Sequence, residues 1–325
     1  MNNTMNTTVF ADTIDGVREY LNTIPRETDK LRVILGLVKA EHAPKLVGSI
    51  IVNSIDTEHY ERNQSILMEI GINAFDAKSL RQHANSPGAN GENLLKEIYY
   101  YHFRIKQHAQ YINKKFCPGD PDSNRFGNTR FTTLEEAKDM LTSSFVWDVD
   151  TKDPQGDKCP VILLGHDIRM DTNSLANSTG FDLFSTGTVV ATIDTQQMAR
   201  EMGINNPSGN PKDKIALRDL VKQFDIPYRN PHTAGNDAAY TTISAIYMAL
   251  YGRTLPASTK SVLESINEVE SASRKEVASI GVAKYCARTK LSTDGVENTS
   301  GEISVTTFGE PKVLAVTERI LNPKR

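Results

Sequence analysis

The chain has 325 residues, 38% of them hydrophobic, and a formal net charge of −3 at pH 7. This length suits one large domain or one domain with extensions, and the near-neutral charge excludes a uniformly basic coat for nucleic acid. Three widely separated cysteines, Cys117, Cys159 and Cys286, exclude a zinc-binding spacing and predict free thiols in a reducing, cytoplasmic or nuclear compartment.

The first part of the chain predicts a helical arm followed by a β-hairpin. Helical spacing links four apolar residues: Leu31, Ile34, Leu35 and Val38. They predict an amphipathic helix over about 28–41, within an N-terminal arm of residues 1–46. The β-branched stretch 47–58 predicts a strand, and Ile66–Phe75 predicts a second strand that pairs with it.

Aromatic and basic side chains alternate over residues 94–116, which predict a strand or helix and then a helix. They suit backbone contact and base stacking on nucleic acid, and the alternative is a solvated helix face over a core. A turn-rich loop follows at 117–124. Thr133 and Glu136 then form a capping box that begins a helix over Leu134–Leu141.

The remaining apolar runs predict two buried strands and two helices: Pro160–Gly165, Thr188–Asp194, Leu217–Phe224 and Asp237–Tyr251. Strands that alternate with helices after a hairpin predict an α/β fold, with a mixed sheet flanked by helices on both faces. We expect this domain to span 47–252. A flexible polar tail is expected over 253–325, with one weak helix near Val262–Val277. No apolar run approaches the ~20 residues that cross a bilayer, so no membrane partner is expected.

Carboxylates from three remote segments are expected to meet at one edge of this sheet. Asp56 and Glu58 lie two apart on a strand and project to the same face. Asp171 opens the helix after one buried strand and Asp237 opens the last helix, and loops at strand ends converge on one edge. Two like charges ~4 Å apart repel by about 4 kcal/mol at an effective dielectric of 20. The cluster therefore predicts bound cations, and oxygen-only ligands favour Mg²⁺ or Mn²⁺.

A histidine precedes the last of these acids by five positions. His232 lies in the loop before Asp237, and its ordinary pKa, about 6.5, suits a base that takes a proton from water. Two metal ions ~4 Å apart can clamp a phosphoryl displacement. We therefore predict five catalytic residues, of which the four carboxylates are also ligands of two Mg²⁺ or Mn²⁺ ions: Asp56, Glu58, Asp171, His232 and Asp237.

In this order the segments resemble the three motifs of DEDDh-type 3′–5′ exonucleases, which have an RNase H-like fold. The motifs are Asp56-Thr-Glu58, Gly165-His-Asp-Ile-Arg-Met-Asp171 and His232-Thr-Ala-Gly-Asn-Asp237-Ala238. The resemblance implies a metal-dependent exonuclease that acts on the single-stranded 3′ end of RNA or DNA, with RNA favoured. Two positions depart from the family pattern: Asp167 replaces the usual Asn, and Met170 replaces the usual Phe.

More narrowly, three segments resemble the fungal family called "good for full DEAD-box helicase activity". They are Tyr101–Lys106, Cys117–Gly127 and the Ala-Gly-Asn-Asp-Ala form of the third motif. This resemblance implies a protein partner in RNA export or RNA silencing. It also leaves an alternative open, in which the nuclease fold is a weak or inactive binding module in messenger-RNA export or small-RNA metabolism. A third alternative is an endonuclease of the same fold.

Several nearby residues have structural explanations that compete with catalytic ones. Asp148 and Asp150 form a rival first motif with the same spacing of two. His166 is expected to form structural hydrogen bonds rather than bind metal, and Asp167 either caps a turn or binds metal. Asp194 is expected to be a helix N-cap.

Overall fold

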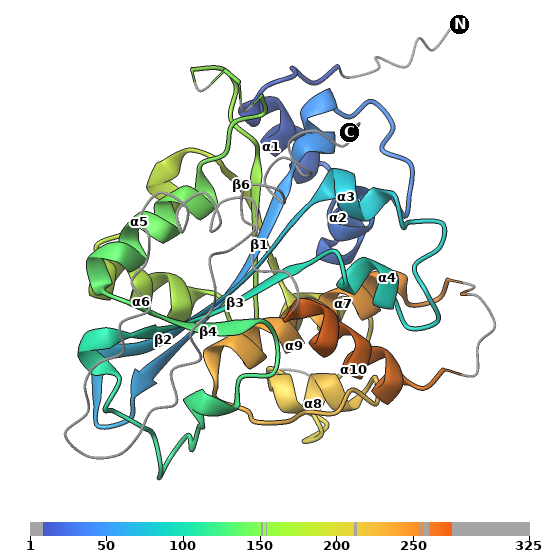
Figure 1. Ribbon diagram of the computed structural model, residues 1–325. Coiled ribbons are helices and arrows are strands. Elements are labelled where there is room, and N and C mark those ends of the chain that lie inside the picture. Colours follow the sequence, from blue (N-terminus) through green and yellow to red (C-terminus); the bar gives the residue numbers. More distant parts are fainter. Residues whose placement is uncertain are drawn as a thin grey trace, which may run out of the picture.

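The computed structural model describes residues 9–150, 152–153, 155–210, 213–253, 255 and 260–274. Within them, six strands form one mixed sheet in the order β4-β3-β2-β1-β5-β6 (Figure 1). The strands are β1 Ile51–Tyr60, β2 Asn63–Asp76, β3 Tyr99–Ile105, β4 Asn128–Thr132, β5 Val161–Gly165 and β6 Val189–Asp194. β1 and β2 form the expected antiparallel hairpin, and β1 pairs with β5 in parallel. The expected α/β fold with a mixed sheet of the RNase H-like kind is therefore confirmed.

Helices cover both faces of this sheet, also as expected (Figure 1). One face carries α5 (Leu134–Phe145) and α6 (Arg169–Thr179). The opposite face carries α1 Ile14–Asn22, α2 Glu27–Ile34, α7 Thr195–Glu201, α8 Leu217–Lys222 and α9 Ala234–Leu250. Two short helices, α3 Ala77–Arg81 and α4 Glu92–Leu95, lie between β2 and β3, and α10 (Val262–Ser273) packs against α4.

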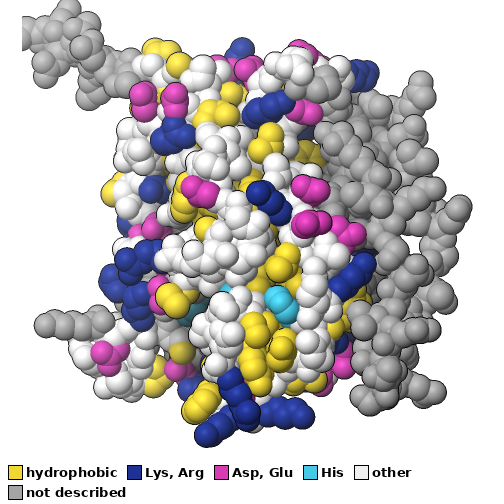
Figure 2. All heavy atoms as spheres, turned by 90° about the vertical axis from the view of Figure 1, so that its left-hand side faces the viewer, with side chains coloured by type: hydrophobic (Ala, Val, Ile, Leu, Met, Phe, Trp, Pro, Cys, Tyr) yellow, Lys and Arg dark blue, Asp and Glu magenta, His cyan; other side chains and the backbone are white. Residues whose placement is uncertain are grey.

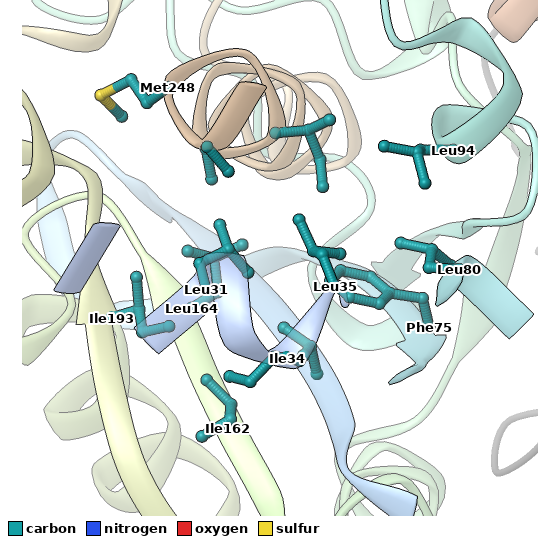
Figure 3. Close-up of a cluster of buried hydrophobic side chains, with 14 of the residues drawn as sticks. Leu31, Ile34, Leu35, Phe75, Leu80, Leu94, Ile162, Leu164, Ile193 and Met248 are labelled. Atoms are coloured by element: carbon teal, nitrogen blue, oxygen red, sulfur yellow. The ribbon is translucent and has the colours of Figure 1, made fainter. Parts of the chain in front are cut away.

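The larger hydrophobic core holds α9 against the sheet. Figure 3 shows apolar side chains of the α2 segment gathered with side chains from strands and from α3 and α9: Leu31, Ile34, Leu35, Phe75, Leu80, Ile162, Leu164, Ile193 and Met248. Nearly every residue of α9 is buried, which explains why its sequence is apolar on all sides. The N-terminus of α9 therefore has a fixed position relative to β1.

Alternation along β1 decides which helices each of its residues faces. Ile51 belongs to the core beneath α5 and α6, whereas Val52 belongs to the core beneath α9. Successive side chains of a strand point to opposite faces. Asp56 and Glu58 therefore face α9, as Val52 does, while Thr57 faces α6.

The N-terminal segment differs from its expected form in two respects. The amphipathic helix ends at Ile34, well before residue 41, because the chain turns at Gly36 with a φ of +69° that favours glycine. A further helix, α1, precedes it, and Val17 and Leu21 of α1 are fully buried. This segment is therefore part of the packed domain, while residues 1–8 lie outside the described ones.

The stretch 94–116 contains β3, but the helix expected after it is only the 3-10 turn η2, Lys106–His108. The capping box of Thr133 and Glu136 is confirmed at the start of α5. None of the helices in the described ranges is long and apolar enough to span a bilayer.

The expected boundary at residue 252 is too early. Ile266 and Val269 of α10 are fully buried in the larger core. Glu270 of the same helix forms an ion pair with Arg125, at 2.6 Å between Nη2 and Oε2. The folded domain therefore includes α10, because its apolar face has a partner. The rest of the expected tail, including Cys286, lies at 275–325, outside the described residues.

Candidate metal centre

The carboxyl-terminal half of β1 supplies two acids to a cleft beneath α9. The Asp56 side chain has an oxygen, Oδ2, that is buried and accepts no hydrogen bond from the described residues. Glu58 pairs across the hairpin with Glu69 of β2, and the register shifts immediately after Glu58. The bulge lets the hairpin bend away beyond the acids, which leaves Asp56 and Glu58 at the base of a cleft.

Asp171 and Asp237 approach these acids from two helices. Asp171, in the first turn of α6, is 8% exposed, and its Oδ1 accepts hydrogen bonds from the backbone N and Oγ1 of Thr57, at 2.9 and 2.7 Å. Asp237, in the first turn of α9, accepts hydrogen bonds from the backbone N of His232 at 2.9 Å and from the hydroxyl of Tyr228 at 3.0 Å. Each helix is thereby tied to the cleft through its acid.

His232 completes the group at the mouth of the cleft. Ligand atoms of Glu58, His232 and Asp237 all lie within 4.8 Å of one another. The His232 Nδ1 atom lies 3.9 Å from Oε1 of Glu58, and the His232 side chain is 41% exposed. His232 has a φ of +57°, which an L-residue rarely adopts. The loop therefore holds the imidazole at a strained backbone position between the acids and solvent.

Burial, with added repulsion between neighbouring carboxylates, raises the pKa values of the clustered acids. Burial, followed by the charge of Asp171, raises the pKa of Asp56 well above its ordinary value, and burial with the charge of Asp237 does the same to the pKa of Glu58. Burial raises the pKa of Asp171 to about 6 and that of Asp237 to about 7. Burial and the charge of Arg218 lower the pKa of His232. The protein therefore keeps these acids together at an electrostatic cost that a divalent cation would offset.

Two glycines allow the N-terminus of α9 to reach the sheet. A Cβ on Gly71 of β2 would lie 2.0 Å from the backbone oxygen of Ala234. A Cβ on Gly235 would lie 2.7 Å from Cβ of His102. Only glycine permits so close an approach of helix and strand. This role was not predicted from the sequence, although a glycine inside a predicted strand signals close backbone packing.

A fifth acid, Glu69, lies beneath the cluster and was also missed. Its Oε2 atom is 2.8 Å from Nε2 of His102 and accepts a hydrogen bond from the backbone N of Ala234. Nδ1 of His102 contacts the hydroxyl of Thr129 at 2.9 Å. Glu69 and His102 are almost completely buried. The pair therefore links β2, β3 and β4 to the start of α9, and a lone acid within an apolar strand was its signal in the sequence.

The acids open into a cleft of about 850 Å³ that extends along α8. Its lining includes Leu217, Val221 and Ile226 on an apolar wall, with Arg218 and Lys222 beside them. A cleft of this size, with an apolar wall, a few cations and acids at one end, has the dimensions of a site for a small ligand. Figure 2 shows a face of the molecule on which acidic, basic and hydrophobic side chains are interspersed and histidine reaches the surface near the middle.

The competing residues have structural roles. His166 contacts the hydroxyl of Thr195 at 2.7 Å and the backbone oxygen of Ile215 at 3.0 Å, as expected of a structural histidine. The Asp194 side chain caps α7, also as expected. Asp148, of the rival first motif, lies outside the six strands and pairs with Lys158.

The Asp167 side chain forms an ion pair with a lysine, and, in addition to burial, its charge contributes to the raised pKa of Asp171. Its Oδ1 atom lies 2.7 Å from Nζ of Lys214, and its φ is +61°. The additional negative charge at this position is therefore balanced by a lysine. Met170, the other departure, is 69% exposed.

The fold and the cleft together define a class of protein. A mixed RNase H-like sheet with four carboxylates and a histidine at the end of its central strand is the architecture of a nuclease-type domain. A model of the family described as DNA polymerase III subunit epsilon-like, C-terminal domain, matches residues 51–248, which is more than half of the chain. The chain belongs to this DEDDh family, so the resemblance drawn from its motifs is confirmed.

Two fungal relatives are similar over the same part of the chain. An uncharacterized nucleolar protein of Schizosaccharomyces pombe is 27% identical over 189 residues, which are 58% of this chain and 64% of that protein. An uncharacterized protein of Saccharomyces cerevisiae is 23% identical over 214 residues, which are 61% of this chain and 41% of that protein. The chain thus covers less than two thirds of either relative's own length.

Proposed function

We propose that the protein is a metal-dependent 3′–5′ exonuclease that hydrolyses phosphodiester bonds at the single-stranded end of RNA or DNA. The observation that carries this proposal is the buried Oδ2 of Asp56, which accepts no hydrogen bond from the described residues. It lies among carboxylates whose charges raise one another's pKa. A buried carboxylate oxygen needs a partner, and a cation is the partner that also relieves the repulsion.

The donor set fits Mg²⁺ or Mn²⁺. Asp56, Glu58, Asp171 and Asp237 offer only carboxylate oxygens, which hard divalent cations prefer. We propose that these four residues hold two such ions. When bound, the ions would supply charge stabilisation to the phosphoryl oxygens and acidify a water molecule.

The protein's own side chains would hold the metal ligand Asp237 in place and deprotonate the attacking water. Because its pKa is lowered, His232 is neutral near pH 7 and can accept a proton from the attacking water. Its exposure leaves it able to pass that proton to solvent. Tyr228 and the backbone of His232 fix both oxygens of Asp237, and the apolar wall of α8 excludes water from one side of the terminal nucleotide.

The test is degradation of end-labelled single-stranded RNA and DNA with Mg²⁺ or Mn²⁺. We expect shortening from the 3′ end and no cleavage of a circular strand, because a circle has no end. Asp171→Asn should lower turnover by at least about 100-fold, since loss of groups that merely support a metal ligand already costs about 10–100-fold. Asp182→Asn is the matched control, because Asp182 caps the 3-10 turn Leu183–Thr186 and lies outside the cleft lining. Unaltered substrates with wild-type protein, or equal rates for both variants, would refute the proposal.

A second candidate function is a binding module that keeps the nuclease fold with little or no activity. The departure at Met170, which is largely exposed beside the cluster, favours it. Calorimetry with Mn²⁺, read together with the degradation assay, separates the two candidates, because an enzyme binds the ion and shortens strands, whereas a binding module leaves strands intact.

For location and partners we propose the nucleus and an RNA-associated protein. The S. pombe relative is named as a nucleolar protein, which supports a nuclear location here. The resemblance to the fungal helicase-linked family supports a partner in RNA export or RNA silencing. Fractionation of cells that express the full chain tests the location.

A further inference from the structure

One loop beside the metal centre is unusually well anchored. We call residues 113–119 the rim loop. The Glu61 carboxylate accepts hydrogen bonds from three consecutive backbone N atoms of this loop, in Lys114, Lys115 and Phe116, at 3.4, 3.0 and 2.8 Å. Asn113 adds two bonds to the same hairpin turn, one to the oxygen of His59 and one from the N of Glu61, each of 2.7 Å. The rim loop is therefore locked to the end of β1.

The other end of the rim loop lies against the proposed catalytic histidine. A Cβ on Gly119 would lie 2.1 Å from the backbone oxygen of His232, so the two segments are in direct backbone contact. Thr233 donates a hydrogen bond to the oxygen of the next residue, Asp120, at 3.0 Å. Burial and the charge of Glu58 raise the pKa of Cys117, which also places the loop beside the acids.

Phe116 stands out among the aromatic residues of this part of the sequence. Tyr100, Tyr101 and Phe103 are buried strand residues in the two cores, so they form neither a stacking surface nor the solvated helix face that was the alternative. Phe116 is 68% exposed although its backbone is held in place. The ammonium group of Lys115 lies 4.9 Å from the centre of its ring.

We propose that Phe116, Lys114 and Lys115 form a platform for the nucleotide that precedes the 3′-terminal one in a single strand. An exposed ring on an ordered loop can stack on any base. The two exposed lysines supply attraction to phosphate at the edge of a cluster that would otherwise repel a polyanion. The proposal rests on the proposed function, because that function places the terminal nucleotide in the adjacent cleft.

The platform predicts tolerance of sequence and dependence on a base. Stacking uses the face that all bases share, so the platform should bind any base at this position. A strand with an abasic site there should lose the contribution of Phe116. This pattern differs from recognition by hydrogen bonds, which would distinguish one base from another.

The experiment measures binding of a fluorescently labelled single-stranded tetranucleotide to the full chain by anisotropy, in Ca²⁺ to hold back turnover. Phe116→Ala should weaken binding by about tenfold, since stacking on one base is worth about 5–150-fold, and Phe116→Trp should restore it. Phe184→Ala is the matched control, because Phe184 is also an exposed aromatic but follows α6, away from the cleft lining. When the nucleotide that precedes the 3′-terminal one is abasic, wild type and Phe116→Ala should bind the strand equally. Lys115→Met should weaken binding and reduce its dependence on salt.

The outcomes separate this platform from the proposed function. If wild type degrades strands and Phe116→Ala binds and degrades them as well as wild type does, the platform is refuted and the nuclease stands. If wild type degrades nothing but Phe116→Ala still binds tenfold more weakly, the platform stands and the exonuclease is refuted. If Phe116→Ala weakens binding equally whether or not the nucleotide before the 3′-terminal one carries a base, stacking is refuted. Loss of binding to a protein partner alone, with nucleic-acid binding unchanged, would assign Phe116 to a protein interface instead.

Discussion

The two helices that supply acids to the cleft hold them in different ways. Asp237 begins a helix that is buried along almost its whole length. Its first turn is packed against Gly71 and tied to the buried pair of Glu69 and His102. α6, by contrast, buries only Asp171 and Leu175. Asp171 is attached to the sheet through Thr57 alone among the hydrogen bonds described above.

This difference indicates that the α9 side of the candidate metal centre is held more rigidly than the α6 side. The α9 side has the contacts that would hold the proposed metal ligand Asp237 and the proposed base His232 in place, and a catalytic site needs such groups held within about 0.5 Å. The α6 side carries exposed groups, Met170 and the ion pair of Asp167 with Lys214. We expect it to adapt to the strand that enters. Changes on the α9 side should therefore have larger effects than changes on the α6 side.

Gly71→Ala should damage the rigid side most. The new Cβ would lie 2.0 Å from the backbone oxygen of Ala234 and 2.8 Å from the backbone N of Gly235, and neither atom can move without the helix. Overpacking of this kind costs about 1–3 kcal/mol and occasionally more, and we expect about 3 kcal/mol here. The displaced helix would also carry Asp237 away from Asp56. Urea unfolding and Mn²⁺ binding measure the two effects.

Gly48→Ala is the matched control for that variant. Its Cβ would lie 3.5 Å from the end of the Arg81 side chain, which is an ordinary contact. Its unfolding free energy should change by less than about 1 kcal/mol. Equal unfolding midpoints for the two variants would show that α9 does not depend on the close approach at Gly71.

The stability of the metal-free protein should fall as pH rises. The pKa of Asp171 is about 6 and that of Asp237 about 7, both raised by burial from an ordinary value of 3.8. Between about pH 4 and pH 7 the folded protein holds protons that the unfolded chain has released, so the free energy of unfolding decreases with pH. We expect the melting temperature in chelator to be lower near pH 8 than near pH 5. The difference should be roughly 3 °C or more, since about 1 kcal/mol corresponds to about 2–4 °C in a domain of this size.

Bound divalent ions and the substitution Asp56→Asn should each offset the loss of stability at high pH. Mn²⁺ should raise the melting temperature more near pH 8, where the acids are ionised, than near pH 5. Asp56→Asn removes one of the repelling charges, so in chelator near pH 8 it should be more stable than wild type. If the metal-free protein instead gains stability over the same pH range, the acids are not held together as described.

Much of the fold could be predicted from local patterns, and the exceptions have clear causes. β-branched runs identified β1, β2, β5 and β6, and the capping box identified the start of α5. The packing of α10 could not be foreseen, because Ile266 and Val269 are buried by residues far away in the sequence, and Glu270 pairs with the equally distant Arg125. The early end of α2 depends on the left-handed turn at Gly36, which outweighs the helical spacing of the residues after it.

The candidate site divides in the same way. The four proposed acids stood out because acids at a spacing of two, or at a helix start, form short local patterns, and His232 stood out because it precedes Asp237 by five positions. Glu69 and His102 did not, because the partner of each lies on another strand. The salt bridge of Asp167 is equally non-local, since Lys214 follows it by 47 residues. Local sequence therefore indicated which groups carry chemistry, and only the structure indicates what holds them.

The smallest effect should come from the α6 side, through Asp167→Asn. Asp167 and Lys214 are 40% and 45% exposed, and exposed ion pairs contribute between about 0 and 1 kcal/mol. We therefore expect the unfolding free energy to change by less than about 0.5 kcal/mol. Because Lys214 balances the charge of Asp167, the variant should keep the wild-type order of activity with Mg²⁺ and Mn²⁺. A reversed metal order in Asp167→Asn, with unchanged stability, would instead show that this carboxylate acts on the metal centre despite its lysine partner.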